Sequence, residues 1–444
     1  MSIFKAYDVR GTYPDQLNKE IAYKIGRAFV TFLDCKNVVV AKDMRDSSNE
    51  LEEALIEGIL DQGRDVISIG LSSTPMMYFA VSKFGYDAGI MITASHNPKQ
   101  YNGFKFVREK AIPLSGKTGI KDIEKIVKNK NFAQNKDRGI IEQRTDILQD
   151  YILNGLSFQT IKKLKKLKIA VDYGNGMGAL IGKKFFPHLN CEIVPLYSEL
   201  DGNFPNHEAN PLKEENLKDL KKLIIKEKAD FGIAWDGDAD RLFFVDEKTN
   251  TIGSDKITAL IAQDLLQETP KLKILYDLRS SKIVPEIIEK NKGWPIITRV
   301  GHSFIKEKMR KEEAIFAGEL SGHFYLKDNY YFESPFFIIL RILELITKKE
   351  KTLSELIEPL NKYYATGEIN SEVDDKQEKI KELAEKYKDA KKIFYLDGIS
   401  IEFDSWWFNV RPSNTEPLLR LNLEADTKKL MEEKKIEVLK IIRS

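Results

Sequence analysis

The apolar run AGIMI at residues 88–92 is followed directly by the polar segment TASHNP at residues 93–98. A short, partly β-branched run that ends in a proline-closed loop is typical of a buried strand. We expect Ser95 to lie just beyond the carboxyl end of that strand, where open α/β sheets place their ligands. Ser95 is therefore a candidate nucleophile. The same residues also suit an ordinary turn in which Ser95 and Asn97 bond to the backbone.

Helix and strand patterns alternate on both sides of this stretch. An amphipathic helix pattern covers residues 21–32, and short apolar runs at 38–40 and 66–69 fit strands. Such alternation predicts a doubly wound α/β domain with a mainly parallel sheet. Similar patterns recur twice further along the chain. From residue 367 onward the pattern changes to strands, helices and a hairpin turn at residues 397–398, which indicates an α+β domain.

These patterns predict an α/β protein of four domains. We expect three related doubly wound α/β domains at residues 1–145, 146–250 and 251–362, and a C-terminal α+β domain at residues 363–444. The three α/β units suggest an internal structural repeat, although no sequence period accompanies it.

Composition excludes several classes of partner. Charged residues make up 31% of the 444-residue chain, yet the formal net charge is only +2, which argues against nucleic acid or an anionic membrane as a partner. The two cysteines, Cys35 and Cys191, are too few to stabilise a chain of this size through disulfides. They fit a reducing compartment. The first residues lack an apolar signal-peptide core, and no run approaches the length of a membrane span. We therefore expect a cytoplasmic protein.

Three acids alternate with small residues directly after a predicted strand at 231–235. Asp236, Asp238 and Asp240 can bend around one hard cation, and oxygen ligands in a tight loop suit Mg²⁺. A calcium loop would need glycine where Arg241 stands, and the flanking segments read as strands instead of helices. A solvated acidic turn stays open as an alternative.

A glycine-rich turn suggests a different function. The strand pattern at 168–173 leads into GNGMGA at 174–179, and Glu199 follows at about the distance expected of a dinucleotide-binding fingerprint. NAD binding is therefore a rival hypothesis.

Two further loops offer groups for a phosphorylated sugar. The segment RPSNT at 411–415 contains a guanidinium fork, two hydroxyls and an amide, which suit a phosphate dianion, although such a hairpin loop can also be purely structural. Glu319 and Ser321 supply an acceptor and a donor that neighbouring sugar hydroxyls could use. A phosphorylated Ser95 would suit the Asp loop, because a phosphate oxygen on Mg²⁺ has its charge offset and its phosphorus is easier to attack.

In this combination the chain resembles the α-D-phosphohexomutase superfamily over nearly its whole length. Four loops stand in the family's order: TASHNP (93–98) resembles the phosphoserine loop, DGDADR (236–241) the magnesium loop, GELSGH (318–323) the sugar loop and RPSNTEP (411–417) the phosphate loop. The resemblance implies three related α/β domains and a smaller fourth domain around a central cleft. It also weakens the NAD hypothesis, because the family itself has a glycine turn of this kind in its second domain.

The resemblance implies roles for individual residues. Ser95 would be the phosphorylated nucleophile, whose phosphate shares Mg²⁺ with Asp236, Asp238 and Asp240. The residues implied to contact the substrate or the transferring phosphoryl group are Tyr7, Arg10, Lys105, Arg241, His302, Glu319, Ser321, His323, Arg411, Ser413, Asn414 and Thr415.

One departure from the family pattern concerns the general acid or base. Many relatives carry lysine where this chain has Arg279. Because an arginine stays protonated, electrostatic or phosphate contact is the better expectation for it. His96, the neighbour of Ser95, is the alternative candidate.

The implied reaction moves phosphate reversibly between the 1- and 6-positions of a hexose through a bound hexose 1,6-bisphosphate. Leu320 favours the phosphomannomutase/phosphoglucomutase branch, because phosphoglucosamine mutases commonly have glutamine there. A phosphoglucosamine mutase, a Mg²⁺-dependent sugar phosphatase and a catalytically silent sugar-phosphate binding protein are the alternatives. We expect small hexose phosphates as the partners, and a monomer or homodimer.

Overall fold

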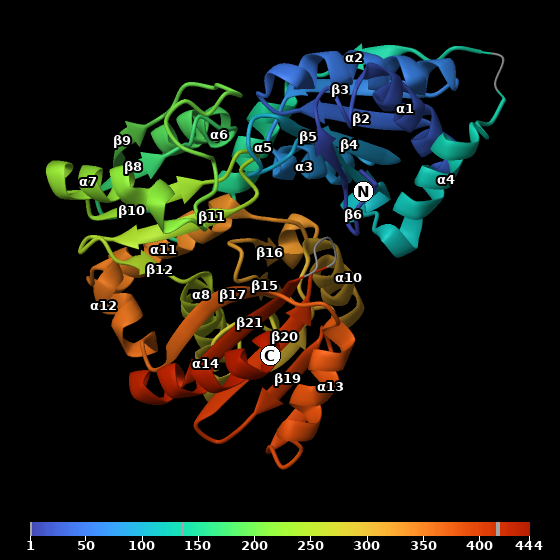
Figure 1. Cartoon of the computed structure of the whole chain (residues 1–444). Helices are drawn as coiled ribbons and strands as arrows, with labels where there is room; N and C mark the ends of the chain where they lie inside the picture. Colours follow the sequence, from blue (N-terminus) through green and yellow to red (C-terminus); the bar gives the residue numbers. More distant parts are fainter. Residues whose placement is uncertain (1, 135–136, 414–417) are drawn as a thin grey trace. The chain divides into compact units, whose positions relative to one another are not determined.

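The computed structural model describes residues 2–134, 137–413 and 418–444. They belong to two compact units (Figure 1). Unit 1 comprises Met1–Gly253 and Ser321–Leu356, and unit 2 comprises Ser254–Leu320 and Ile357–Ser444. Each unit is described below by itself.

The first sheet of unit 1 has the strand order β1-β5-β4-β2-β3-β7, with β6 paired to β5. Its strands are β1 (Val9–Thr12), β2 (Asn37–Lys42), β3 (Asp65–Leu71), β4 (Ala88–Ile92), β5 (Tyr101–Arg108), β6 (Ile112–Pro113) and β7 (Ile141–Gln143). The strands β4, β2, β3 and β7 are parallel, whereas β5 runs antiparallel between β4 and β1. All five residues of β4 are buried, so the predicted strand before Ser95 is confirmed.

Several helices precede, follow or connect the strands of this sheet. They are α1 (Lys19–Leu33), α2 (Asp46–Asp61), α3 (Thr74–Phe84), α4 (Lys121–Asn129) and α5 (Ile147–Leu156), with the short turns η1 (Glu109–Ala111) and η2 (Gly116–Ile120). The α1 helix starts at the Asn18 cap, whose side chain accepts from the Ile21 amide, and its predicted apolar stripe is buried in the domain core. The sequence pattern thus located the helix and the side that it buries.

The second sheet of unit 1 has the strand order β12-β11-β10-β8-β9. Its strands are β8 (Leu167–Asp172), β9 (Cys191–Leu196), β10 (Phe231–Trp235), β11 (Leu242–Asp246) and β12 (Thr251–Ile252), and the helical segments with it are α6 (Gly178–Phe185), η3 (Phe186–His188), η4 (Glu214–Leu217) and α7 (Lys218–Glu227). Because β11 runs antiparallel to β10, the segment 236–241 forms the tight connection between two paired strands. The three acids are therefore held by backbone pairing on both sides.

The returning segment of unit 1 contains β16 (Phe324–Leu326), η5 (Lys327–Asn329), α11 (Pro335–Lys349) and the start of α12 (Leu353–Ile357). The ring of Phe336 on α11 stacks on the ring of Phe185, with 4.0 Å between the ring centroids, and its centroid lies 5.1 Å from that of Tyr151. Helix α11 therefore packs with helices of both sheets in this unit.

Unit 2 combines a parallel sheet with an antiparallel one. Strand β13 (Lys273–Asp277) pairs in parallel with β14 (Trp294–Thr298) and β15 (Phe316–Gly318), and the helices are α8 (Ser254–Glu268), α9 (Ile283–Lys290) and α10 (His302–Glu312). The antiparallel sheet has the order β17-β21-β20-β19-β18. Its elements are η6 (Glu358–Leu360), β17 (Tyr364–Glu372), α13 (Lys376–Lys386), β18 (Lys392–Phe394), β19 (Ile399–Glu402), β20 (Trp406–Pro412), β21 (Leu418–Ala425) and α14 (Lys428–Arg443). Helix α14 packs on β17 and β21 of this sheet (Figure 1).

The predicted fold class is confirmed, since α/β sheets are followed by an α+β domain. The predicted hairpin is confirmed too, with Gly398 at φ 69° between β18 and β19. The exact domain boundaries stay predictions. None of the helices in the described ranges is both long and apolar enough to cross a membrane.

Helices α1 and α2 meet through two glycines. A Cβ on Gly58 would lie 2.1 Å from the Tyr23 carbonyl oxygen, and one on Gly26 would lie 2.3 Å from the Leu55 carbonyl oxygen. Both close contacts are with backbone, so the helices would have to move apart to admit a methyl group.

We therefore predict that Gly58→Ala destabilises unit 1 by about 1–3 kcal/mol, despite the higher helix propensity of alanine. Gly116→Ala is the matched control, because the nearest atom to its added Cβ lies 3.6 Å away. Differential scanning calorimetry should show a lower first transition for Gly58→Ala only. Equal transition temperatures for the two variants would contradict the close packing.

Candidate active site

Ser95 lies at the carboxyl end of β4 and faces the acidic loop. Its hydroxyl Oγ donates to Asp236 Oδ2 at 2.9 Å, and His96 Nδ1 lies 3.2 Å from the same Oγ. The residue is buried and has a left-handed φ of 51°, which is uncommon for a residue other than glycine. Its amide donates to Thr93 Oγ1 at 2.8 Å. The structure thus brings the candidate nucleophile to the acids, although they are 141 positions apart in the sequence.

The three acids form one buried cluster. Carboxylate oxygens of Asp236, Asp238 and Asp240 all lie within 4.8 Å of one another. Oδ1 of Asp238 is buried and has no hydrogen-bond partner within the described part of the chain. Three hard oxygen donors, one of them without a hydrogen bond, are a set that can hold a divalent metal ion.

Lys105 on β5 offsets part of this charge. Its Nζ lies 2.6 Å from Asp238 Oδ2 and 2.6 Å from Asp240 Oδ2. Burial alone would lower the pKa of Lys105, but the two carboxylates raise it well above its ordinary value. Lys105 is therefore a fixed cation at neutral pH and cannot act as a base.

The pKa values of two of the acids shift in opposite directions. Burial and the neighbouring Asp240 and Asp238 raise the pKa of Asp236 well above its ordinary value. Burial acts in the same direction on Asp240, yet Lys105 and then His323 lower its pKa well below the ordinary value. The negatively charged form of Asp236 is therefore unfavourable in this cluster.

Two arginines lie beside the Ser95 loop and the acids. Arg10 on β1 donates to Asn97 Oδ1 and to Asp8 Oδ2, each at 2.6 Å. The Nε of Arg241 lies 3.6 Å from Asp236 Oδ2. Tyr7, which precedes β1, is half-buried. The predicted basic residues of unit 1 thus lie around the cluster.

His96 is neutral in this surrounding. Burial lowers its pKa well below the ordinary histidine value, and the cations of Arg241 and Arg10 lower it further. At pH 7 an unprotonated ring nitrogen at 3.2 Å from Ser95 Oγ can accept a proton.

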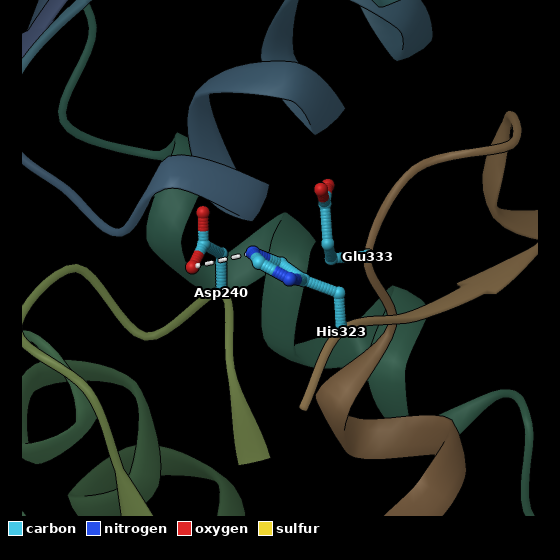
Figure 2. A group of neighbouring side chains, drawn as sticks. All are labelled: Asp240, His323 and Glu333. Carbon is cyan, nitrogen blue, oxygen red and sulfur yellow. Dashed lines mark ion pairs between the residues drawn. The ribbon is translucent and has the colours of Figure 1, made fainter. Parts of the chain in front are cut away.

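A second group with metal-ligand residues adjoins the cluster. Asp240, His323 and Glu333 are drawn in Figure 2, where the His323 ring lies between the two carboxylates. His323 Nε2 is 3.3 Å from Asp240 Oδ1, and its Nδ1 is 2.9 Å from Ser321 Oγ. Both ring nitrogens of His323 thus have polar neighbours, so the all-oxygen group of three aspartates is the better candidate for a metal.

The other predicted site residues lie in unit 2. Arg279 Nη2 donates to Asp277 Oδ2 at 2.9 Å and to Glu319 Oε1 at 3.3 Å. Burial opposes the charge of Arg279, but Asp277 and Glu319 raise its pKa, so it stays protonated. This supports an electrostatic role for Arg279 and none as a base.

One carboxylate of unit 2, that of Glu368, contacts both Arg279 and Arg411. Glu368 Oε2 accepts from Arg411 Nη2 at 2.5 Å and lies 3.9 Å from Arg279 Nη1. Ser413 Oγ accepts from Arg420 Nη2 at 3.5 Å. His302 is the first residue of α10. Asn414 and Thr415 lie outside the described residues.

Several residues of the site carried no sequence signal. Thr74, the first residue of α3, donates its hydroxyl to Asp238 Oδ2 and its amide to the Asp238 carbonyl oxygen. Glu333 and Glu368 belong to no recognisable motif. Arg45 contacts the Ser95 loop from the turn after β2. These residues approach the site only through folding, so spacing along the chain could not reveal them.

The glycine turn at 174–176 supports the acid loop. A Cβ on Gly176 would lie 2.7 Å from the Gly237 carbonyl oxygen, to which the Met177 amide donates at 2.8 Å. The amides of Asn175 and Gly176 also donate to backbone carbonyls. Because these amides are already hydrogen-bonded, they do not form the amide cradle that a dinucleotide pyrophosphate needs.

The chain matches four family models, which together cover most of its length. They are described as the phosphoglucomutase/phosphomannomutase alpha/beta/alpha domains I (residues 1–134), II (148–251) and III (253–363) and the C-terminal domain (368–441).

Full-length relatives and a solved structure agree. A phosphomannomutase of Methanocaldococcus jannaschii is 43% identical, with 100% of this chain and 98% of the relative covered. A phosphomannomutase of Escherichia coli K12 is 40% identical, with 96% and 95% covered. A crystal structure of a phosphoglucomutase/phosphomannomutase family protein from Burkholderia thailandensis superimposes with a TM-score of 0.91 at 32% identity, covering 99% of this chain and 96% of that one. With the buried serine and acid cluster described above, these matches show that the chain belongs to the phosphoglucomutase/phosphomannomutase family of phosphohexomutases.

Proposed function

We propose that this chain moves phosphate reversibly between the 1- and 6-positions of mannose or glucose through a phosphorylated Ser95. The observation that carries this proposal is the 2.9 Å contact of Ser95 Oγ with Asp236 Oδ2, because an ester formed on that oxygen would lie beside the acid cluster. The relatives named phosphomannomutase and phosphohexose mutases support the choice of sugar.

The three aspartates would hold Mg²⁺. The buried Asp238 Oδ1 without a hydrogen-bond partner in the described ranges and the raised pKa of Asp236 both fit a cation at this position. When bound there, Mg²⁺ would offset the charge on phosphoryl oxygens and make the phosphorus easier to attack.

The chemistry consists of two phosphoryl transfers. In the first, the bond between Ser95 Oγ and phosphorus breaks as the phosphorus bonds to the free sugar hydroxyl, which gives an enzyme-bound 1,6-bisphosphate. In the second, Ser95 Oγ attacks the other phosphate and releases the product. Over the cycle, a proton moves from the hydroxyl that accepts a phosphate to the hydroxyl that is freed.

We propose that His96 handles the proton of Ser95. In the first transfer the accepting sugar hydroxyl loses its proton and Ser95 Oγ gains one, and in the second Ser95 loses that proton and the freed sugar oxygen gains one. The Nδ1 of His96, 3.2 Å from Oγ, would relay the proton at Ser95 in both steps. Lys105, a permanent cation against two of the acids, stabilises charge without exchanging protons.

Residues outside the acid cluster would bind the part of the substrate that is not reacting. Arg411 would grip the distal phosphate, and the gathering of Arg411 and Arg279 near the Glu368 carboxylate supports an anion at this place. Glu319 and Ser321 would contact two sugar hydroxyls in either orientation of the bisphosphate. Ser95 can then react with the phosphate at each end in turn.

Removal of the nucleophile should abolish turnover. We predict that Ser95→Ala lowers mutase kcat at least about 1,000-fold with glucose 1,6-bisphosphate and Mg²⁺ present. Intact-mass spectrometry should find one phosphate on the wild-type protein and none on this variant. The control is Ser157→Ala, which removes a surface hydroxyl bonded to the Asn154 carbonyl oxygen. Full turnover of Ser95→Ala would contradict the mechanism, and stoichiometric release of inorganic phosphate by the wild type would indicate a phosphatase.

Two substitutions of similar size should shift stability in opposite directions. In a chelator at neutral pH, Asp236→Asn should raise Tm by a few degrees, because burial and like charges raise the pKa of Asp236 and its ionised form opposes folding. Asp240→Asn should lower Tm, because Lys105 depresses the pKa of Asp240 and its ionised form favours folding.

Differential scanning fluorimetry with and without Mg²⁺ measures both effects. Mg²⁺ should raise the Tm of the wild type and much less that of either variant, since each loses a ligand. A wild-type Tm that does not respond to Mg²⁺, or two variants that shift together in the chelator, would contradict the assigned metal site.

The preferred sugar can be tested by competition among three 1-phosphates. We predict that kcat/KM for mannose and glucose 1-phosphates differs by less than about tenfold. The two sugars differ only at C2, and the proposed Glu319 and Ser321 contacts, to the 3- and 4-hydroxyls, do not sense that position. Glucosamine 1-phosphate should be the poorest of the three. Clear preference for the amino sugar would assign the chain to the phosphoglucosamine mutases instead.

A further inference from the structure

We infer that Arg45 is a positioning residue for the candidate nucleophile. By binding the backbone of the Ser95 loop, it sets where the Ser95 hydroxyl meets the acid cluster. This inference rests on the proposed role of Ser95, and it assigns to Arg45 no contact with the substrate.

The Arg45 side chain donates all of its N–H groups to protein acceptors. Four of them go to backbone carbonyl oxygens of one loop, those of Ser95 (2.9 Å), Asn97 (2.6 Å), Pro98 (2.9 Å) and Tyr101 (3.0 Å). The fifth, from Nε, goes to Asp43 Oδ2 at 3.2 Å. A guanidinium has five N–H donors, so none is left for a phosphate. Arg45 therefore acts on the loop and not on the ligand.

This use of donors separates Arg45 from the arginines nearer the reacting groups. The Nε atoms of Arg10 and Arg241 are buried and have no hydrogen-bond partner among the described residues. They retain donor capacity for an anion, whereas Arg45 retains none.

The Arg45 guanidinium is itself held rigidly. It is 2% exposed, follows β2 and occupies the cap position of α2. Asp43 accepts from both its backbone amide and its Nε, and also from Ser48 Oγ at 2.7 Å. The ring of Phe204 lies 5.0 Å from the guanidinium carbon. A planar cation fixed by a carboxylate and an aromatic ring loses little entropy when it binds the loop.

The Ser95 carbonyl links Arg45 to the acid loop. It accepts from Arg45 Nη2, and a Cβ on Gly237 would lie only 2.5 Å from its oxygen. The two loops therefore touch at the peptide that follows the Ser95 Cα. Ser95 also adopts a left-handed backbone conformation, which persists only where its surroundings enforce it. Loss of the guanidinium would release four carbonyls of this loop, and the Ser95 hydroxyl would no longer be fixed against Asp236.

Arg45→Lys keeps the positive charge but removes the planar guanidinium with its five N–H donors. A lysine ammonium has three donors at a single point and cannot span four carbonyls. We predict a fall in kcat of about 100-fold, the effect of misplacing a reacting atom by about 1 Å. KM should change less than threefold, because the substrate contacts remain.

The matched control is Arg341→Lys in the same unit. Arg341 is 3% exposed, donates to Glu344 Oε2 at 3.3 Å and lies beside the Phe337 ring, but its helix α11 does not carry the proposed site. Both variants should lose Tm, whereas only Arg45→Lys should lose kcat when each is assayed well below its own Tm. Equal kcat values at that point would overturn the inference.

A rescue experiment separates positioning from general destabilisation. Arg45→Ala leaves a cavity that guanidinium can enter, so millimolar, non-denaturing guanidinium should restore part of kcat, and equimolar urea should not. Phe204→Leu is a milder variant that keeps Arg45 but loosens it, and kcat should fall several-fold. No rescue together with an unchanged kcat in Phe204→Leu would overturn the inference.

The same samples report on the proposed function separately. If the wild-type protein carries no phosphate on Ser95 and Ser95→Ala remains active, the proposed mechanism fails. If the wild type is phosphorylated and Ser95→Ala is inactive, but Arg45→Lys turns over at the wild-type rate, the role of Arg45 alone fails.

Discussion

Repulsion among three buried carboxylates is the constraint on which the arrangement of unit 1 depends. Oxygens of Asp236, Asp238 and Asp240 lie within 4.8 Å of one another, away from water. Such a cluster forms only if the surrounding backbone is fixed and part of the charge is offset. Pairing of β10 with β11 fixes the loop, and Lys105 supplies the compensating cation. The remaining negative charge is what a metal ion would offset.

The same constraint explains why so many close backbone contacts converge on the site. Gly176 admits the Gly237 carbonyl, and Gly237 in turn admits the Ser95 carbonyl, at distances that a Cβ could not tolerate. Two loops from different sheets can thus share one small volume. Arg45 then gathers the carbonyls of the Ser95 loop, so that the hydroxyl is positioned by backbone and not by its own side-chain freedom.

In unit 2 the charged groups form ion pairs around two arginines. Here arginines alternate with carboxylates: Glu368 contacts both Arg279 and Arg411, and Asp277 and Glu319 hold Arg279 in place. Cations kept in position by shared carboxylates suit the recognition of a mobile anion, because they are oriented before it arrives.

The sequence by itself determined the fold class, the strand before Ser95, the acid loop after β10 and the family resemblance. These features are local: apolar periodicity, turn residues and acids at alternate positions are visible in short windows. Only the tertiary structure decided that Ser95 bonds to Asp236, that Lys105 stands between two acids, and that Thr74, Glu368 and Arg45 take part. Their partners are distant in sequence, and burial sets their protonation, so neither could be derived from residue spacing.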